Sequence, residues 1–190
     1  MILFVGLGNP EDRYKNTRHN IGFRVIDKLV DDSNARDISK SSFNGKLYRT
    51  SNSLFLKPTT YMNLSGKSVI AVKNFFKIDL EDIIVIHDDI DLPFGAVRFK
   101  RGGGHGGHNG LRSIDALVGK EYLRVRVGVG KPEYKSQVAD YVLGDFSEDE
   151  SRYLDALIEY VAKATKALSK SSLNEVKSNY TLKSVESLEI

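Results

Sequence analysis

The chain has 190 residues, of which 41% are hydrophobic and 28% are charged, and its formal net charge at pH 7 is +3. This length suits one well-packed domain and is short for two. The absence of cysteine excludes disulfides and zinc–thiolate sites. No apolar run approaches the roughly 20 residues that a membrane-spanning helix needs. The apolar N-terminal stretch is short and has no basic leader, so we interpret it as a strand rather than a signal peptide and expect a cytoplasmic protein.

Hydrophobic periodicity predicts the secondary structure. In chain order the predicted elements are a strand at 2–7, a helix at 20–31, a hairpin of strands at 46–50 and 53–57, a helix at 65–77, strands at 82–87 and 96–100, a short helix at 110–118, a strand at 122–129 and a long helix at 148–169. The run at 82–87 is apolar throughout, which is typical of a central strand buried on both faces.

Strands interleaved with helices indicate an α/β protein. Because two strand pairs break the strict strand–helix–strand order, we expect a mixed sheet. The prediction is a single domain over residues 1–190 that forms a three-layer α/β/α sandwich around a twisted mixed β-sheet. Residues 171–190 are polar and serine-rich, and we expect them to form a frayed tail with one helical turn.

The positive charge is concentrated in the middle of the chain. Residues 94–135 contain nine Lys and Arg against three Asp and Glu, whereas residues 144–190 contain six basic and nine acidic residues. This asymmetry indicates one face that binds a polyanion. Charge alone leaves an ordinary solvated surface as an equally good interpretation.

The stretch GLGNPEDRYKNTRHN (6–20) lies between the first strand and the first helix, where a dinucleotide-binding turn would be. Its first two glycines fit that motif, but the third position is Glu11. A carboxylate there would meet the pyrophosphate, so we reject the nucleotide interpretation. The carboxyl ends of strands are where open α/β sheets bind ligands. The stretch supplies that edge with Asn9, Tyr14, Arg18, His19 and Asn20.

Two further connectors carry polar groups. PTTYMNLSG (58–66) places Asn63 just before a helix, where an N-cap is the better interpretation from sequence alone. HDDIDLPFG (87–95) begins with three acids in five residues, which could hold a metal ion or orient a base.

The stretch GGGHGGHNG (102–110) cannot contribute to a hydrophobic core. It could cradle a phosphate, hold a metal ion, or present one side chain in a fixed place. We interpret His105 and His108 as structural. A metal ion is disfavoured because a glycine-rich loop does not fix coordination geometry without more ligands nearby.

In order and spacing, the motifs GLGNP…Y..TRHN.G, PTTYMN.SG, HDD.DLP.G and GGGHGGHNGL..I closely resemble the bacterial-type peptidyl-tRNA hydrolase family. The stretches YLRVRVGVGKP and YVLGDFS extend the resemblance from residue 1 to about residue 150. The family usually has glycine where this chain has Glu11. Since Glu11 disfavours the positive φ of a type II turn after Pro10, we expect a type I turn there.

The resemblance implies an enzyme of translation quality control and ribosome rescue. Such an enzyme hydrolyses the ester between a peptide and the 3′ ribose of tRNA. His19 matches the catalytic histidine of the family, a general base for water. Asp88 matches the carboxylate that orients this histidine and stabilises its protonated form.

The resemblance also implies the substrate contacts. The matching substrate-binding residues are Asn9, Tyr14, Tyr61, Asn63 and Asn109. Amide side chains can donate to an oxyanion and accept from peptide N–H groups, and aromatic rings can pack on the terminal adenine or ribose. On this interpretation the glycine-rich loop presents Asn109 to the acceptor end of the tRNA.

Lys100 and Arg126 match the basic pair that holds the 5′ phosphate of tRNA in the family. We expect three neighbours on the same basic surface: Arg98, Arg101 and Arg124. The resemblance implies no metal and no cofactor. It implies peptidyl-tRNA as the partner, bound through its acceptor stem and 3′ end, no membrane, and a cytoplasmic monomer without an obligate protein partner.

Two other functions stay open. One is a non-enzymatic RNA-binding protein of the same fold, as in organelle relatives that act in intron splicing; the retained His19, Asp88 and three asparagines argue against it. The other is an unrelated α/β esterase or peptidase, which is disfavoured because the sequence has no G-x-S-x-G motif and no metal-ligand spacing.

Overall fold

The structure is a computed structural model that describes residues 1–188. Its strands and helices are, in chain order, β1 (Ile2–Gly6), α1 (Ile21–Ser33), β2 (Arg36–Asp37), β3 (Gly45–Arg49), β4 (Ser53–Pro58), α2 (Ser65–Phe76), β5 (Ile83–Asp89), β6 (Val97–Arg101), α3 (Asn109–Leu117), β7 (Leu123–Gly128), α4 (Val138–Val142), α5 (Glu148–Ala167) and α6 (Leu173–Tyr180). The predicted strands and the four predicted helices are all present, with ends within two residues of those expected, whereas the short β2 and α4 were not predicted. In the described part of the chain, no helix combines the length and the apolar character needed to cross a membrane.

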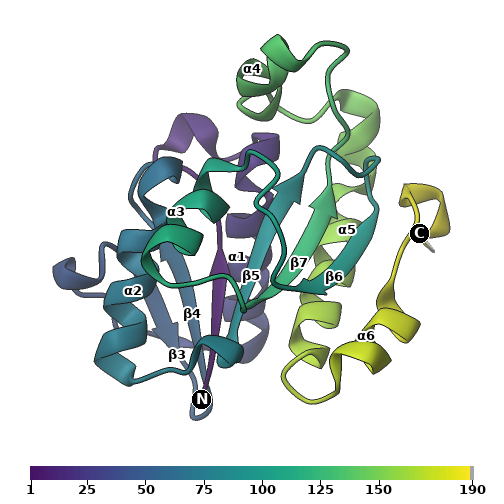
Figure 1. The fold of residues 1–190 in the computed structure, drawn as a ribbon. Helices are drawn as coiled ribbons and strands as arrows, with labels where there is room; N and C mark the ends of the chain where they lie inside the picture. The colour runs from purple at the N-terminus through teal and green to yellow at the C-terminus, as the bar shows by residue number, and fades with distance from the viewer. Residues whose placement is uncertain (189–190) are drawn as a thin grey trace.

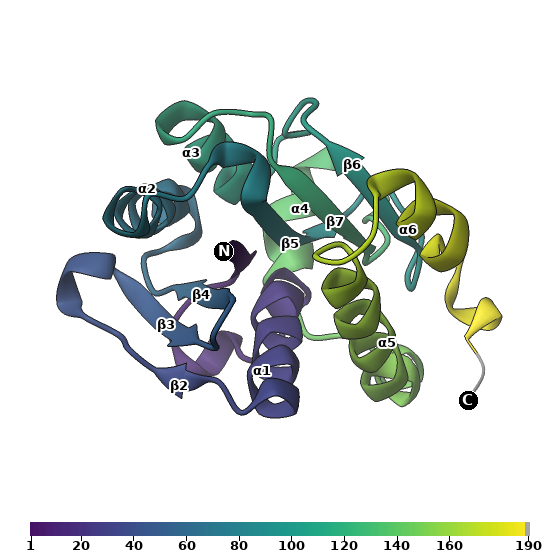
Figure 2. The same cartoon turned by 90° about the horizontal axis from the view of Figure 1, so that it is seen from below.

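The strands form one mixed sheet in the order β2-β3-β4-β1-β5-β7-β6 (Figures 1 and 2). β1 is parallel to β4 and β5, and β5 is parallel to β7. The pairs β2–β3, β3–β4 and β6–β7 are antiparallel. The predicted mixed sheet and the predicted β3–β4 hairpin are therefore confirmed. β6 and β7 are also paired, but α3 lies between them in the chain.

Helices cover both faces of the sheet, as Figure 2 shows, with α1 and α5 on one side and α2 and α3 on the other. Successive residues of β5 alternate between the two cores, with Ile84 and Ile86 packed toward α1 and α5. Ile83 and Val85 pack toward α2 and α3. This double burial explains why the run is apolar throughout. The predicted three-layer α/β/α sandwich is confirmed.

The parallel strands β1, β4 and β5 end at one edge of the sheet, at the top in Figure 1. The connectors that leave this edge are residues 7–20, 59–64 and 90–96. α4 lies above the same edge. Segments far apart in the sequence are thereby brought to one place, as expected for a ligand site of an open α/β sheet.

The C-terminal segment is not a frayed tail. α6 is eight residues long, and its Val176 is fully buried. Leu182 pairs with Val97 of β6 through backbone hydrogen bonds of 2.9 and 3.1 Å, so the segment covers the edge of the sheet (Figure 1). The few apolar residues recur at a spacing that turns them toward the core, a pattern that overall polarity conceals. The tail predicted over 171–190 is therefore wrong up to residue 188, and the last two residues lie outside the described part.

Candidate active site

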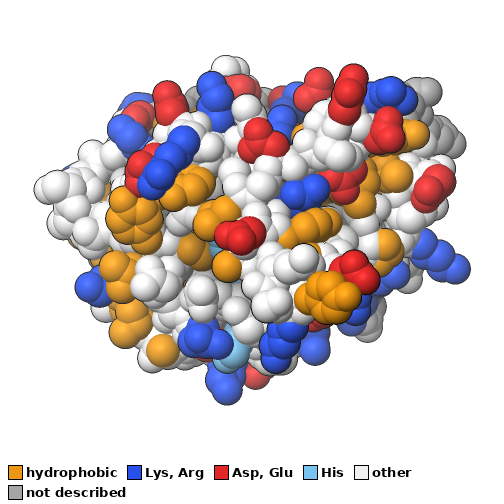
Figure 3. All heavy atoms as spheres, turned by 90° about the horizontal axis from the view of Figure 1, so that it is seen from above, with side chains coloured by type: hydrophobic (Ala, Val, Ile, Leu, Met, Phe, Trp, Pro, Cys, Tyr) orange, Lys and Arg blue, Asp and Glu red, His pale blue; other side chains and the backbone are white. Residues whose placement is uncertain are grey.

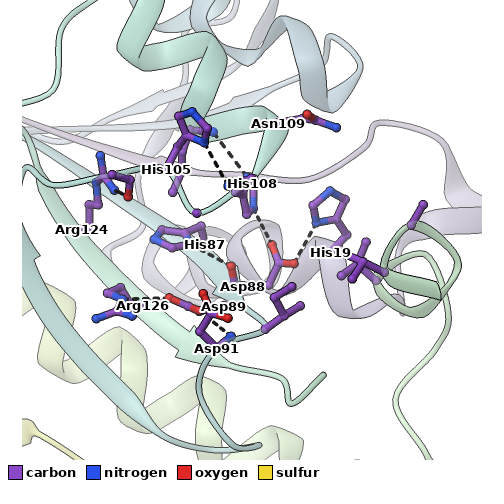
Figure 4. A pocket seen from close by; sticks show the side chains of 18 of the residues that line it. His19, His87, Asp88, Asp89, Asp91, His105, His108, Asn109, Arg124 and Arg126 are labelled. Carbon is purple, nitrogen blue, oxygen red and sulfur yellow. Dashed lines mark hydrogen bonds and ion pairs between the residues drawn. The ribbon is translucent and has the colours of Figure 1, made fainter. Parts of the chain in front are cut away.

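A cleft of about 430 Å³ opens at the carboxyl edge of the sheet, between the end of β5, the glycine-rich loop and α4 (Figures 3 and 4). In the view from above, Lys and Arg side chains gather around the visible histidine atoms (Figure 3). The predicted site residues that line the cleft are His19, Asp88, Lys100, Asn109 and Arg126. The sequence missed the apolar wall, which comes from α4 and includes Val138 and Val142.

His19 and Asp88 form a buried pair on the floor of the cleft (Figure 4). His19 lies in a 3₁₀ turn just before α1, and Asp88 lies in β5. The His19 Nδ1 atom is 2.8 Å from Asp88 Oδ2. With the proton on Nδ1, this nitrogen donates to the carboxylate and leaves the lone pair of Nε2 available, which is the arrangement of a general base.

His108 binds the other oxygen of Asp88, at 2.9 Å from its Nε2 to Oδ1 (Figure 4). Its Nδ1 accepts backbone N–H groups of Gly110 and Leu111 and so caps α3. Because Nδ1 is an acceptor, the proton must be on Nε2, which therefore donates to Asp88. The structural interpretation of His108 is thus incomplete: besides capping a helix, it fixes the carboxylate that holds His19. Nothing in the sequence signals this contact between residues far apart in the chain.

The pKa values of this pair follow from burial and mutual attraction. Burial lowers the pKa of His19, but the charge and hydrogen bond of Asp88 outweigh it, so that pKa is raised above its ordinary value. Burial alone would raise the pKa of the Asp88 carboxyl, yet the two histidines beside it hold that pKa well below its usual range. The carboxylate therefore stays charged, as the stabiliser of an imidazolium must.

His87 borders the cleft as a neutral ring. Burial, with His108 beside it, lowers the pKa of His87 to about 4. Its Nδ1 donates to the backbone carbonyl of Asp88 at 2.8 Å. His87 therefore adds no positive charge next to the His19–Asp88 pair, and it steadies the backbone of Asp88.

Asn9 is buried, and its orientation is fixed by the segment that follows β4. Its Oδ1 accepts the backbone N–H of Met62 at 3.0 Å. The backbone of Asn9 is in turn held by the Asn20 side chain, which accepts from its N–H at 2.8 Å and donates to its carbonyl at 2.9 Å. The sequence places Asn20 at this edge of the sheet but predicts no role for it. Because Oδ1 is used, the Asn9 side chain offers its Nδ2 as a donor.

Of the predicted substrate residues, only Asn109 lines the cleft, and Asn9, Tyr14, Tyr61 and Asn63 lie outside its lining. Asn63 is exposed in a 3₁₀ turn before α2 and makes no capping hydrogen bond, so the N-cap interpretation is wrong. Asn109 is the exposed first residue of α3. Tyr61 is 55% exposed, and Tyr14 is half-buried.

The basic surface is smaller than predicted. Arg124 is buried, and its guanidinium donates to the carbonyl groups of Gly103 and Gly104. Arg98 donates to the Leu182 carbonyl at the C-terminal segment. Arg101 follows Lys100 in β6 and so points to the opposite face. The expectation that these three arginines form one basic surface with Lys100 and Arg126 is wrong, because each donates to backbone carbonyl groups or faces away.

Lys100 and Arg126 remain on the cleft side of the antiparallel β6–β7 pair. Lys100 is exposed. The Nε of Arg126 is 2.8 Å from Asp89 Oδ2, so its guanidinium is held in place by a carboxylate (Figure 4). An anionic ligand at this cleft would meet the remaining N–H groups of Arg126, the Lys100 ammonium and Lys135, which also lines the cleft.

The glycine-rich loop needs its glycines for backbone geometry. Gly106 and Gly107 have φ values of +59° and +83°, a region that side chains disfavour. The loop returns the chain so that His108 meets Asp88 and Asn109 begins α3. The buried Arg124 fixes the start of the loop through two carbonyl groups. The loop is thus bonded to the rest of the protein at its start, through Arg124, and near its end, through His108.

The turn around Glu11 differs from the one expected. Glu11 has φ −79° and ψ 145°, an extended conformation just before the 3₁₀ turn at 12–14. Neither a type I nor a type II turn has this geometry at its second central residue. The positive φ was correctly excluded, and the type I turn is wrong because Glu11 is the extended N-cap residue of the 3₁₀ turn that follows.

The described residues also contain a set with the composition of a metal site, since ligand atoms of His19, Asp88 and His108 lie within 4.8 Å of one another. In this arrangement both histidines direct an N–H group to Asp88. A divalent ion would have to displace both protons before it could bind. The expectation of no metal and no cofactor stays a prediction.

The chemistry of the cleft follows from its lining. Among the described residues that line it there is no serine, threonine or cysteine. The imidazole of His19 is a base that can activate a water molecule. Fold and site together define a class of protein, a hydrolase with an α/β fold and a histidine–aspartate pair.

Comparison with known proteins identifies the family. The profile described as peptidyl-tRNA hydrolase matches residues 3–187. The peptidyl-tRNA hydrolase of Sulfurovum sp. (strain NBC37-1) is 71% identical over 100% of both chains. That of Sulfurimonas denitrificans is 58% identical over 96% of this chain and 97% of its own. The crystal structure of peptidyl-tRNA hydrolase from Acinetobacter baumannii has a TM-score of 0.91 at 35% identity, with 97% of this chain and 96% of that one covered. The chain belongs to the peptidyl-tRNA hydrolase family.

Proposed function

We propose that this protein hydrolyses the ester bond between the peptide and the 3′ ribose of peptidyl-tRNA, which recycles tRNA from stalled translation. Membership of the peptidyl-tRNA hydrolase family supports this hydrolysis reaction. The observation that carries the proposal at the level of residues is the His19–Asp88 pair in a cleft whose described lining contains no serine, threonine or cysteine.

In the proposed reaction, His19 Nε2 takes a proton from water as the water oxygen attacks the ester carbonyl carbon. Amide donors from Asn9 and Asn109 stabilise the oxyanion that develops. The bond from the carbonyl carbon to the 3′ oxygen then breaks, and the proton on His19 passes to that oxygen. The products are the free peptide acid and tRNA. Asp88 stays ionised throughout and stabilises the imidazolium.

The direct test is incubation of the purified protein with N-acetyl-aminoacyl-tRNA, followed by measurement of ester cleavage against buffer. Catalytic release of the acetylated amino acid is expected. Tight binding of tRNA without cleavage would instead favour the non-enzymatic RNA-binding alternative.

The partner that fits this function is peptidyl-tRNA, bound through its acceptor stem and 3′ end. We propose that the protein works in the cytoplasm as a monomer without an obligate protein partner, because its family acts in translation and one chain supplies the whole His19–Asp88–His108 network. A molecular mass in solution well above that of one chain would contradict the monomer.

Lys100→Ala and Arg126→Ala are each expected to weaken tRNA binding and to flatten its salt dependence. Each variant removes about one phosphate contact, which lowers the slope of log affinity against log salt by about 0.7–0.9. Lys100→Ala is the cleaner change, because Arg126→Ala also leaves Asp89 unpaired. Dissociation constants at several salt concentrations measure the effect.

The control for this experiment is Lys163→Ala, which removes an exposed cation from α5 on the far side of the sheet. Its salt slope should match that of the unchanged protein. If the two cleft cations bind the 5′ phosphate, dephosphorylated tRNA should remove most of the difference between variant and parent. A difference that persists on dephosphorylated tRNA would leave only a general electrostatic role.

His108→Asn is expected to lower kcat by about tenfold, because a hydrogen bond to a charged group contributes on the order of 1.5–3 kcal/mol. Asparagine can still cap α3, but its shorter side chain does not reach Asp88. Without this donor, Asp88 attracts the His19 proton more strongly, so the pKa of His19 rises further. The acidic limb of the pH–rate profile should therefore move to higher pH.

His105→Asn is the matched control, since His105 lies in the same loop and its side chain, among the described residues, bonds only to the loop backbone, at Gly107. It should leave the pH–rate profile in place. If His108→Asn lowers the rate without moving the profile, His108 supports the loop but does not act on Asp88.

A further inference from the structure

Four side chains next to Asn9, from the segments that follow β1 and β4, form a continuous array, which we call the rim array: Glu11, Arg13, Tyr14 and Tyr61. Glu11 Oε1 accepts the Tyr61 hydroxyl at 2.7 Å. Glu11 Oε2 is 3.0 Å from Arg13 Nε. The Arg13 guanidinium lies over the Tyr14 ring, 4.6 Å from its centroid. One carboxylate and one guanidinium thus connect two tyrosine rings.

The hydrogen bond from Tyr61 joins two segments that are distant in sequence. A second hydrogen bond lies next to it, in which Asn9 Oδ1 accepts the backbone N–H of Met62. Tyr61 is adjacent to Met62, and Glu11 is two residues from Asn9, so the turn after β1 and the segment after β4 are bonded at neighbouring points. The extended backbone of Glu11 is what directs its side chain to Tyr61.

This contact leaves Tyr61 with a fixed hydroxyl and an accessible ring. The side chain is 55% exposed, and its single O–H donor is used by Glu11. Both carboxylate oxygens of Glu11 are also engaged, one by Tyr61 and one by Arg13. The hydrogen bond lowers the pKa of Glu11 and raises the pKa of Tyr61, as expected of a neutral phenol that donates to a charged carboxylate.

The chemistry presented by the rim array is aromatic and cationic. The Tyr61 ring is exposed and the half-buried Tyr14 ring lies under the Arg13 guanidinium. Aromatic rings and guanidinium groups are the groups on which unpaired bases of RNA stack. The substrate proposed above ends in unpaired nucleotides that must pass the turn carrying Asn9 to bring the ester to His19. A ring already fixed at its hydroxyl loses less conformational freedom when a base stacks on it.

We propose that Glu11 is a positioning residue that holds Tyr61 as a stacking surface for an unpaired nucleobase at the 3′ end of the tRNA. The inference rests on the proposed function for the identity of the ligand. It assigns Glu11 no contact with the reacting atoms.

The test compares dissociation constants for deacylated tRNA with an intact 3′ end and for the same tRNA without its unpaired 3′ nucleotides. Glu11→Ala, and Tyr61→Phe, which keeps the ring but removes the bond, should each weaken binding of intact tRNA about three- to fivefold, since exposed pairs contribute little. The double variant should bind no more weakly than either single variant. None of them should differ from the parent on the truncated tRNA.

Asp12→Ala is the matched control, because it removes an acid from the same turn that has no ion-pair partner among residues 1–188. It should bind like the parent. A second readout is the Tyr61 phenol pKa, followed by nuclear magnetic resonance of ring-labelled tyrosine, which should fall toward its ordinary value in Glu11→Ala.

The inference fails if Glu11→Ala binds intact tRNA as tightly as Asp12→Ala does. It also fails if the affinity losses of Glu11→Ala and Tyr61→Phe multiply in the double variant, or if the same losses are found with the truncated tRNA. Cleavage by the unchanged protein is measured in parallel. Absence of cleavage would overturn the proposed function, whereas normal cleavage with unaltered binding by Glu11→Ala would overturn only the role of Glu11.

Discussion

Replacing His19 by alanine is expected to lower kcat for cleavage of N-acetyl-aminoacyl-tRNA by roughly 10²–10⁴-fold, the range of positioned acid–base groups. The imidazole is the one base of the His19–Asp88–His108 network with a nitrogen free of its neighbours, since His108 uses Nδ1 for the α3 cap and Nε2 for Asp88. The affinity for tRNA should hardly change, because His19 carries no phosphate contact in this proposal.

The pH dependence of the parent enzyme should report the same base. His19 must be neutral at Nε2 to accept a proton from water. Its pKa is raised by Asp88, so activity should be full above that pKa and be lost as the pH falls through it. The acidic limb of kcat/KM should therefore lie above the value of about 6.5 for an unperturbed histidine. A midpoint below that value would contradict the raised pKa.

Two measurements separate catalysis by His19 from a structural role. Dissociation constants for tRNA and single-turnover cleavage rates are compared for His19→Ala and the parent. Loss of cleavage with retained binding supports the base. Equal loss of binding and cleavage would mean that His19 maintains the structure of the cleft and is not the base.

Replacing Asn9 by aspartate should narrow the preference for N-blocked over free aminoacyl-tRNA by about tenfold or more, since an unpaired or lost hydrogen bond costs on the order of 1–3 kcal/mol. The two substrates differ at the α-nitrogen, which is a neutral amide in one and largely an ammonium in the other. Because the Asn9 oxygen is bound to the Met62 N–H, the group left for the substrate in this proposal is the Nδ2 donor, which can bond to the carbonyl oxygen of the blocking group but not to an ammonium.

Aspartate keeps the shape of Asn9 and can still accept from Met62, because one carboxylate oxygen replaces Oδ1. The other oxygen replaces a donor by a negative charge, which attracts an ammonium and repels an oxyanion or carbonyl. The ratio of kcat/KM for acetylated and free aminoacyl-tRNA measures the change. If both efficiencies fall in parallel and the ratio stays the same, Asn9 serves the reaction but does not select the substrate.

Local sequence determined the helices and strands and the edge of the sheet at which the candidate active site lies. The apolar run of β5 and the spacing in α1 or α5 follow from burial of particular faces, which is a property of neighbouring residues. The polar connectors after β1, β4 and β5 necessarily share an edge once the strands are parallel. The shared edge indicates a ligand site, whereas the pairing of His19 with Asp88 follows from the resemblance of the ordered motifs to the family that comparison confirms.

Only the tertiary structure decided which polar side chains are free. Arg124 and Lys100 lie opposite each other in β7 and β6, yet Arg124 is buried against loop carbonyl groups and Lys100 is exposed. The sequence predicted a structural role for His108, but the loop places its ring against Asp88. The polar composition of the C-terminal segment predicted a frayed tail, but Leu182 pairs with β6. These outcomes depend on contacts between residues far apart in the chain, and the energy of a buried polar group is set by the partner it meets there, which no local pattern records.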